Sequence, residues 1–210
     1  MLAGYLVERI TNQSLEDYCR ENIFQPLDMK NTSFDFSSLD RGNVARPYGY
    51  FCKLFFPLPK YELYLFDPAA GLWTTAEDLS HFLMMHLNGG VYNGKRILKE
   101  ENVCLMHSIQ CPDCYDLLLG NFLGGELTLR HGLGWMHINL LGHKLEGHAG
   151  GAPGYNCHMY VLRDDESSED IGLVLMGNGP ILCPAALYGK TTVNSLIKML
   201  ELIEEKIGMV

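Results

Sequence analysis

Apolar residues follow two different periods along this chain, and the change falls near residue 131. Before that point they recur at helical spacing in several segments, whereas after it they recur at every second position, as in strands. The pattern predicts one domain over residues 1–210, with a mainly helical and loop region at 1–130 and an antiparallel sheet plus a C-terminal covering helix at 131–210. The predicted fold class is therefore α/β (α+β), an antiparallel β-sheet flanked by helices.

Capping residues mark the helices of the first region. Ser14 and Thr75 each precede an apolar helical stripe, and an aspartate stands three residues after each of them. Pro26 ends the earlier helix, and the glycine pair at 89–90 ends the later one. Two further helices are expected, at the very start of the chain and near 99–109. The first has no capping residue before it, which suggests a helix cut from a longer chain.

The segment 27–72 has no sustained period. It holds prolines at 47, 57, 59 and 68 and is dense in tyrosine and phenylalanine. We expect a long irregular connection, whose aromatic side chains either pack beneath the loop or line a substrate groove. Beyond it, Asn93-Gly94 predicts a hairpin turn. Strands are expected at 133–141, 144–148, 155–162 and 171–177, and the covering helix at about 185–207.

The composition is that of a globular protein, with 47% hydrophobic and 20% charged residues. A net charge of −9 argues against nucleic acid or an anionic membrane as a partner, because both call for a basic face. No apolar run is long enough to span a bilayer. Glu8 and Arg9 interrupt the first apolar stretch, so no secretory signal is expected.

The seven cysteines are odd in number and lack framework spacing. They favour mostly free thiols and a reducing, cytoplasmic compartment. His107, Cys111 and Cys114 could supply three ligands of a zinc site, but no second pair of matching spacing follows, and two ordinary thiols in a loop are the other interpretation. We expect no metal site and no cofactor.

One local pattern could supply a nucleophile. Ser195 and Lys198 stand one helical turn apart, so the amine could approach the hydroxyl as a base. The pair lies inside the expected covering helix rather than at a helix N-terminus facing a cleft, so we do not expect it to be catalytic. No Gly-x-Ser-x-Gly elbow occurs in the sequence.

The candidate site is the glycine-rich segment 147–155, which begins next to His148. With no Cβ on Gly150, Gly151 or Gly154, the backbone can turn sharply and present N–H groups to a ligand. Pre-aimed N–H groups of this kind stabilise developing negative charge. Two other interpretations remain: a β-turn that happens to be rich in glycine and proline, and a hydrogen-bonded histidine at a strand end.

This segment, HAGGAPG at 148–154, resembles the third motif of the serine β-lactamase and penicillin-binding-protein superfamily. It is closest to the class C β-lactamase-related esterases and peptidases, in which His-x-Gly can replace Lys-Thr-Gly. Further segments match in order and spacing: LAGYLVE at 2–8, NIFQPLDM at 22–29, DPAAGLWTTAEDL at 67–79, GLGW at 132–135 and MGNG at 176–179. The resemblance runs nearly end to end and implies a β-lactamase/transpeptidase-like fold.

The resemblance also implies roles in an enzyme that forms and hydrolyses an acyl-serine. His148 would border the cleft and orient the nucleophile's network, and the Gly151 N–H would be an oxyanion donor. Gly150 would permit close approach of the substrate, whereas Pro153 and Gly154 would set the turn.

The sequence departs from the family at two points. Ala149 replaces the Thr or Ser whose hydroxyl the family offers to a substrate carboxylate, which leaves ester or amide substrates open. The family's Ser-x-x-Lys and Tyr-x-Asn motifs belong upstream of a segment like residues 1–8, and no Tyr-x-Asn occurs anywhere. We therefore expect the C-terminal half of a family member, incomplete at its N-terminus.

Two functional hypotheses follow. The first is a β-lactamase-related serine hydrolase of esters or amides that is inactive alone because the nucleophile is absent. It would bind a small-molecule or peptide-like substrate once an N-terminal half completes the site. The alternative is a non-catalytic interaction protein with an exposed apolar sheet edge and face. Whether this chain is an enzyme stays open.

Overall fold

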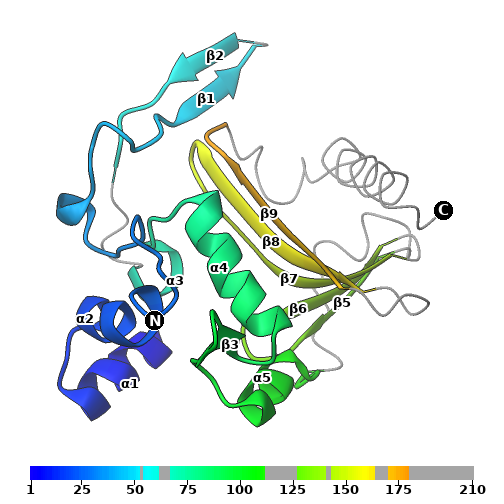
Figure 1. The fold of residues 1–210 in the computed structure, drawn as a ribbon. Coiled ribbons are helices and arrows are strands. Elements are labelled where there is room, and N and C mark those ends of the chain that lie inside the picture. The colour runs from blue at the N-terminus through cyan, green and yellow to red at the C-terminus, as the bar shows by residue number, and fades with distance from the viewer. Residues whose placement is uncertain (53, 62–66, 112–126, 141–142, 164–169, 180–210) are drawn as a thin grey trace.

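The computed structural model describes residues 1–52, 54–61, 67–111, 127–140, 143–163 and 170–179 (Figure 1). In chain order the elements are α1 (Leu2–Thr11), α2 (Leu15–Cys19), the π-helix η1 (Arg20–Phe24), the 3₁₀-helix η2 (Phe36–Ser38), β1 (Tyr48–Phe51), β2 (Leu54–Pro57), α3 (Asp67–Ala70), α4 (Ala76–Leu87), β3 (Val91–Tyr92), β4 (Lys95–Arg96), α5 (Glu100–His107), β5 (Leu127–His131), β6 (Met136–Leu140), β7 (His143–Ala152), β8 (Tyr155–Arg163) and β9 (Ile171–Gly177). The predicted mixture of helices and antiparallel sheet is confirmed.

A five-stranded sheet positions the rest of the molecule. Its order is β5-β6-β7-β8-β9, and every strand runs antiparallel to its neighbour. The sheet begins with β5, which precedes the expected start at residue 131 and was not predicted as a strand. The predicted hairpin at Asn93-Gly94 is confirmed as the connection between β3 and β4.

The two faces of the sheet carry separate apolar clusters. Met159 and Val161 of β8 face α4, where they pack with Leu83 and Trp135. Tyr160, which lies between them in the strand, faces the other side of the sheet, where it packs with Leu145 and Leu162. This alternation is the period of two that a strand imposes. The covering helix predicted at 185–207 lies outside the described residues.

The predicted helix caps are confirmed. The Ser14 hydroxyl accepts a hydrogen bond from the Asp17 N–H at 3.0 Å, and the Thr75 hydroxyl accepts one from the Asp78 N–H at 3.1 Å. At the end of α4, the two glycines at 89 and 90 adopt φ of 58° and 91°, which glycine tolerates best. Before Pro26 the second helix widens into η1, so it does not end as a regular α-helix.

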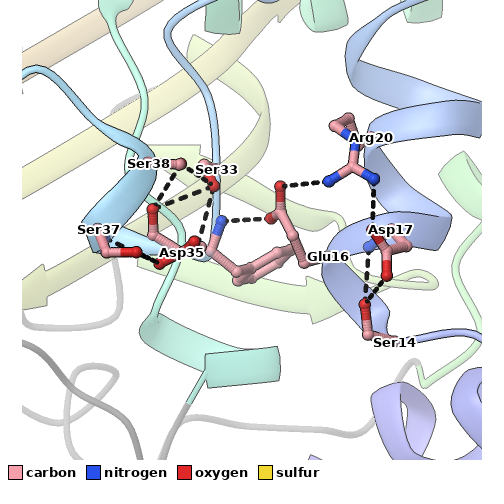
Figure 2. Close-up of polar contacts among 9 residues, drawn as sticks. Ser14, Glu16, Asp17, Arg20, Ser33, Asp35, Ser37 and Ser38 are labelled. Atoms are coloured by element: carbon pink, nitrogen blue, oxygen red, sulfur yellow. Dashed lines mark hydrogen bonds and ion pairs between the residues drawn. The ribbon is translucent and has the colours of Figure 1, made fainter.

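Helix α2 positions the loop that follows it (Figure 2). The Glu16 carboxylate accepts a hydrogen bond from the Phe34 N–H at 2.7 Å, and its other oxygen lies 3.8 Å from the Arg20 guanidinium. Next to Phe34, Ser33 exchanges both backbone hydrogen bonds with Trp73, each at 3.0 Å. The loop that α2 holds therefore also bonds the backbone of Trp73, whose ring packs against Tyr155.

Part of the segment expected to be irregular is a regular hairpin. β1 pairs with β2 from Tyr48–Pro57 to Phe51–Leu54, and in Figure 1 it stands apart from the five-stranded sheet. The prediction was wrong here because both faces of this hairpin are apolar, so its sequence shows no alternation. Among the helices in the described part of the chain, none is long and apolar enough to cross a membrane.

Candidate active site

The glycine-rich segment is a strand, not a loop. β7 continues to Ala152, and Gly150 and Gly151 lie opposite Cys157 and Asn156 of β8. The expected end of the strand at residue 148 and the sharp turn at Gly150 and Gly151 were therefore wrong. The turn lies at Pro153–Gly154, where Gly154 alone has a positive φ, 80°. Glycines in an edge position tolerate extended backbone as well as turns, so their presence did not locate the turn.

β7 has two segments with different neighbours. The inner segment, Lys144–Gly147, is flanked by β6 on one side and β8 on the other. The outer segment, His148–Ala152, extends beyond β6, whose pairing ends at Met136 opposite Gly147. Within the described residues no strand pairs with this edge of the outer segment. An unpaired strand edge presents backbone N–H and C=O groups to whatever lies beside it.

His148 is exposed and lies on the helix side of the sheet. It stands opposite Met159, which packs in the cluster facing α4. Desolvation by the surrounding protein lowers the pKa of His148 below its usual 6.5, and the charge of nearby His131 lowers it further. The ring is therefore neutral at pH 7, with one nitrogen that donates and one that accepts.

The neighbouring side chain points the other way. Ala149 packs against the cluster on the opposite face of the sheet. Position 149 therefore presents its backbone, not its side chain, to the face that carries His148.

The glycines of β7 differ in the space around them. A Cβ built on Gly150 meets no atom within 4 Å, whereas one built on Gly147 lies 1.9 Å from the Met159 carbonyl oxygen. On Gly154 it would lie 2.5 Å from the Cβ of Pro47. Gly147 and Gly154 thus have packing roles, while open space lies in front of Gly150. Sequence reasoning missed Gly147, because nothing local shows which strand approaches it.

Aromatic residues hold the far end of the outer segment. The Tyr61 hydroxyl donates to the Pro153 carbonyl at 2.7 Å, and the Tyr155 hydroxyl donates to the Ala45 carbonyl at 2.8 Å. Trp73 packs edge-on against Tyr155, with ring centroids 5.5 Å apart. Of the two roles expected for the aromatics before residue 73, packing is the one seen for Tyr61.

A buried network of hydrogen-bonded polar side chains holds the inner segment. The Glu146 carboxylate, in a residue that is 5% exposed, is bonded to Nδ1 of His107, whose Nε2 lies 3.0 Å from Nδ1 of His86. Trp135 stacks on His107 with ring centroids 4.0 Å apart. Burial lowers the pKa of His86 to about 4; the charge of His107 acts the same way and that of Glu146 opposes it.

This network of Glu146, His107 and His86 was not predicted from the sequence, although one signal was present. Glu146 stands two positions before His148, so a strand places both side chains on one face. Its partners are 39 and 60 residues earlier in the chain, where no local pattern connects them. His107, considered above as a zinc ligand, is bonded to Glu146 instead.

The other candidates are only partly described. Cys111 is disulfide-bonded and pairs through its backbone with His131, so it is not the free thiol expected of a zinc ligand. Cys114, Ser195 and Lys198 lie outside the described residues. Within the described part of the chain no group of three His, Cys, Asp or Glu side chains could hold a metal ion.

Comparison with known proteins places this arrangement in context. The family model named Beta-lactamase matches residues 1–191. Beta-lactamase-like protein 1 of Dictyostelium discoideum is 34% identical over 77 residues, which is 36% of this chain and 12% of that protein. This chain thus spans a small part of that relative's length.

Solved structures share the fold. The D-amino acid amidase of Ochrobactrum anthropi SV3, complexed with D-phenylalanine, superposes with a TM-score of 0.70 at 22% identity over 98% of this chain and 56% of the amidase. The octameric penicillin-binding protein homologue from Pyrococcus abyssi gives a TM-score of 0.63 at 22% identity, over 94% of this chain and 40% of that one. At these identities the similarity shows the fold alone.

Proposed function

Because this chain belongs to the beta-lactamase family, we propose that it carries one wall of a serine-hydrolase site that cleaves esters or amides through an acyl-serine. The observation that supports the proposal is the outer segment of β7. Among the described residues, it combines an exposed neutral histidine, an unpaired strand edge and open space before Gly150. The inner segment and the aromatic residues hold it at both ends, and such rigid support is what a pre-organised site requires.

In the proposed reaction, a serine oxygen bonds to the substrate carbonyl carbon, and the carbonyl oxygen becomes an oxyanion. The Gly151 N–H donates to this oxyanion from the free edge of β7. His148, neutral at pH 7, orients the hydroxyl network as a hydrogen-bond partner. The serine proton passes to the leaving alcohol or amine, and water then cleaves the acyl-serine. Pro153 and Gly154 keep Gly151 in place through the turn they form.

The only Ser-x-x-Lys in these 210 residues, at Ser195, follows the candidate site instead of preceding it as in the family. We therefore propose that the serine comes from a segment upstream of the site. The chain alone would then not hydrolyse esters or amides. Loss of a nucleophile leaves only a modest residual rate enhancement, on the order of 10³–10⁴ over water in a well-studied serine protease.

The surroundings of the outer segment suggest a substrate class. Ala149 offers no hydroxyl and its side chain faces away from His148, so nothing at this position would select a substrate carboxylate. The open space at Gly150 suits a group that lies flat against the strand. Amides and esters of single amino acids form the first panel to assay, because the amidase shares this fold.

A serine-directed fluorophosphonate probe tests the proposal directly. We expect no labelling of the purified 210-residue chain, and labelling of any longer natural form whose intact mass exceeds that of this chain. In such a form, Gly151→Pro removes the N–H and should lower the acylation rate by about 10²–10³-fold. Gly151→Ala is the matched control, because it changes the same position and keeps the N–H.

Stoichiometric labelling of the chain that is abolished by Ser195→Ala would overturn the proposal and make Ser195 the nucleophile. Labelling of a longer form that is insensitive to both His148→Ala and Gly151→Pro would show that the site lies elsewhere.

The alternative function, a non-catalytic interaction protein, has its own observation. Helix α1 exposes a row of large apolar side chains, including Leu2, Leu6 and Ile10. Such a surface on a folded chain is typical of a protein interface. Under this alternative, sedimentation velocity would show association that increases with concentration and is lost in Leu6→Ser. A monodisperse monomer at all concentrations would count against it.

A further inference from the structure

The hairpin β1–β2 exposes apolar side chains on both of its faces. Directly opposed residues share a face, so Tyr50 and Phe55 lie on one face, where their ring centroids are 4.9 Å apart. Phe51 and Leu54 lie on the other. The Phe56 ring covers Gly49 on this second face. A hairpin that packs against one partner surface needs only one apolar face, whereas this one has two.

Exposure increases toward the tip of the hairpin. Tyr48 and Tyr50, near the base, are 36% and 40% exposed, whereas Phe51 and Leu54, at the tip, are 72% and 71% exposed. The tyrosines carry a polar hydroxyl and the tip residues carry none. This order, with apolar groups outermost and amphipathic rings behind them, matches the gradient from hydrocarbon to headgroup in a bilayer.

The segment of the sequence that contains the hairpin is basic, whereas the chain as a whole is acidic. Residues 41–60 contain the basic residues Arg41, Arg46, Lys53 and Lys60 and no acidic residue, although the net charge of the whole chain is −9. Arg41, Arg46 and Lys60 are exposed and flank the base of the hairpin in sequence. Lys60 also donates to the Arg41 carbonyl at 2.8 Å, which ties the two flanks together.

We propose that the hairpin β1–β2 is a membrane-docking element that inserts its tip into the interface of a bilayer containing anionic lipids. Immersion covers both apolar faces at once, and the basic residues behind the hairpin meet the headgroups. A four-residue strand is about 13 Å long, enough for the tip to enter the roughly 5–10 Å depth that interfacial elements reach. The acidic remainder of the chain stays in water.

The test is co-sedimentation of the 210-residue chain with phosphatidylcholine vesicles, with and without phosphatidylserine. We expect binding that is stronger on the anionic vesicles and weakens as salt rises. Leu54→Ser should weaken binding by about tenfold. Full burial of a leucine side chain contributes about 1.5–3 kcal/mol, and the bilayer interface would bury Leu54 only in part. Leu2→Ser is the matched control, because Leu2 is also 71% exposed but lies on α1; it should leave binding unchanged.

The charge is tested separately. Arg46→Gln should weaken binding to anionic vesicles about fivefold, at about 1 kcal/mol per basic residue near the surface. It should have no effect on phosphatidylcholine vesicles. A further measurement does not depend on any substitution in the apolar tip. An environment-sensitive fluorophore on Cys52, an exposed thiol of the hairpin, should shift to the blue when vesicles are added, in a chain carrying Cys104→Ser.

Three results would overturn the proposal. The first is no binding to either vesicle together with no spectral shift at Cys52. The second is equal loss of binding in Leu54→Ser and Leu2→Ser, which would place the membrane contact elsewhere. The third is concentration-dependent self-association that Leu54→Ser abolishes and vesicles do not change, which would make a second copy of the chain the partner of the hairpin.

Discussion

The inner and outer segments of β7 follow one another in a single strand, yet their surroundings are opposite. The inner segment has a strand on each side, a buried carboxylate at Glu146 and no room for a side chain at Gly147. In the part of the chain that the structure describes, the outer segment has one neighbouring strand, an exposed histidine and unfilled space at Gly150. The strand is fixed where it is packed and accessible where it is not.

The difference shows how a fold can offer a rigid but open edge. The outer segment does not depend on its own packing, because the inner segment holds its start and the aromatic residues hold its end. The Tyr61 hydroxyl donates to the Pro153 carbonyl just after the outer segment, and the Tyr155 hydroxyl donates to the Ala45 carbonyl. Trp73 packs edge-on against Tyr155. A ligand could therefore meet backbone groups that are already in position, which lowers the ordering cost of binding.

The largest expected effect breaks the inner segment. Gly147→Ala places a Cβ 1.9 Å from the Met159 carbonyl oxygen, a backbone atom in the centre of the sheet. We expect a loss of about 4 kcal/mol in the free energy of unfolding, measured by urea denaturation. Gly150→Ala, three positions later, should change it by less than about 1 kcal/mol. Equal losses would contradict the distinction between the two segments.

A change in pH should alter the free energy of unfolding by a similar amount, through the buried network of Glu146, His107 and His86 that holds the inner segment. The folded-state pKa of His86 is about 4, below its ordinary 6.5, so between these values the unfolded chain binds more protons than the folded one. Stability should therefore fall as pH drops from 6.5 toward 4, by about 3 kcal/mol.

Unfolding curves at a series of pH values measure how steeply the free energy of unfolding changes with pH. His86→Phe, which keeps a ring beside Trp135, should make this slope shallower. The pKa values of His148 and His158 are also lowered by burial, so a shallower slope of the same sign should remain in the variant. A slope unchanged by His86→Phe would show that His86 is not its source.

The smallest effect concerns the end of the outer segment. Tyr155→Phe removes the hydrogen bond to the Ala45 carbonyl and should cost about 1 kcal/mol. Amide hydrogen exchange should speed up at residues 43–48 and at the Pro153–Gly154 turn, while the inner segment stays protected. Tyr50→Phe, whose hydroxyl makes no hydrogen bond within the described residues, is the control. Faster exchange throughout β7 would indicate that the two segments open together.

Local signals in the sequence predicted the local structure well. Helix α4 could be predicted because its start and end depend on neighbouring residues. Thr75 caps it by accepting from the Asp78 N–H, and the glycine pair at 89–90 ends it. The strands β8 and β9 followed from their period of two. The end of β7 was missed because glycines carry no side chain and so break the apolar pattern without breaking the strand.

Features formed by distant residues could not be predicted in this way. The side-chain network of Glu146, His107 and His86 joins β7, α5 and α4. Its one signal in the sequence was the position of Glu146 two residues before His148. The hairpin β1–β2 was missed because its aromatics occupy both faces, a pattern that packing on a core does not produce. For the candidate site, the sequence pointed to the segment 147–155 but did not show that its glycines lie in an extended strand.

The hydrogen bonds that close the outer end of β7 also determine when it can form. Tyr61 and Pro153 are 92 residues apart, Tyr155 and Ala45 are 110 apart, and Asn178 bonds the Arg46 carbonyl across 132. Contacts of such long sequence separation close large loops, and they slow folding. We expect β6, β7 and β8 to pair before the loop around Ala45 is captured, so the edge that carries His148 and Gly151 is completed last in folding and opens first in unfolding.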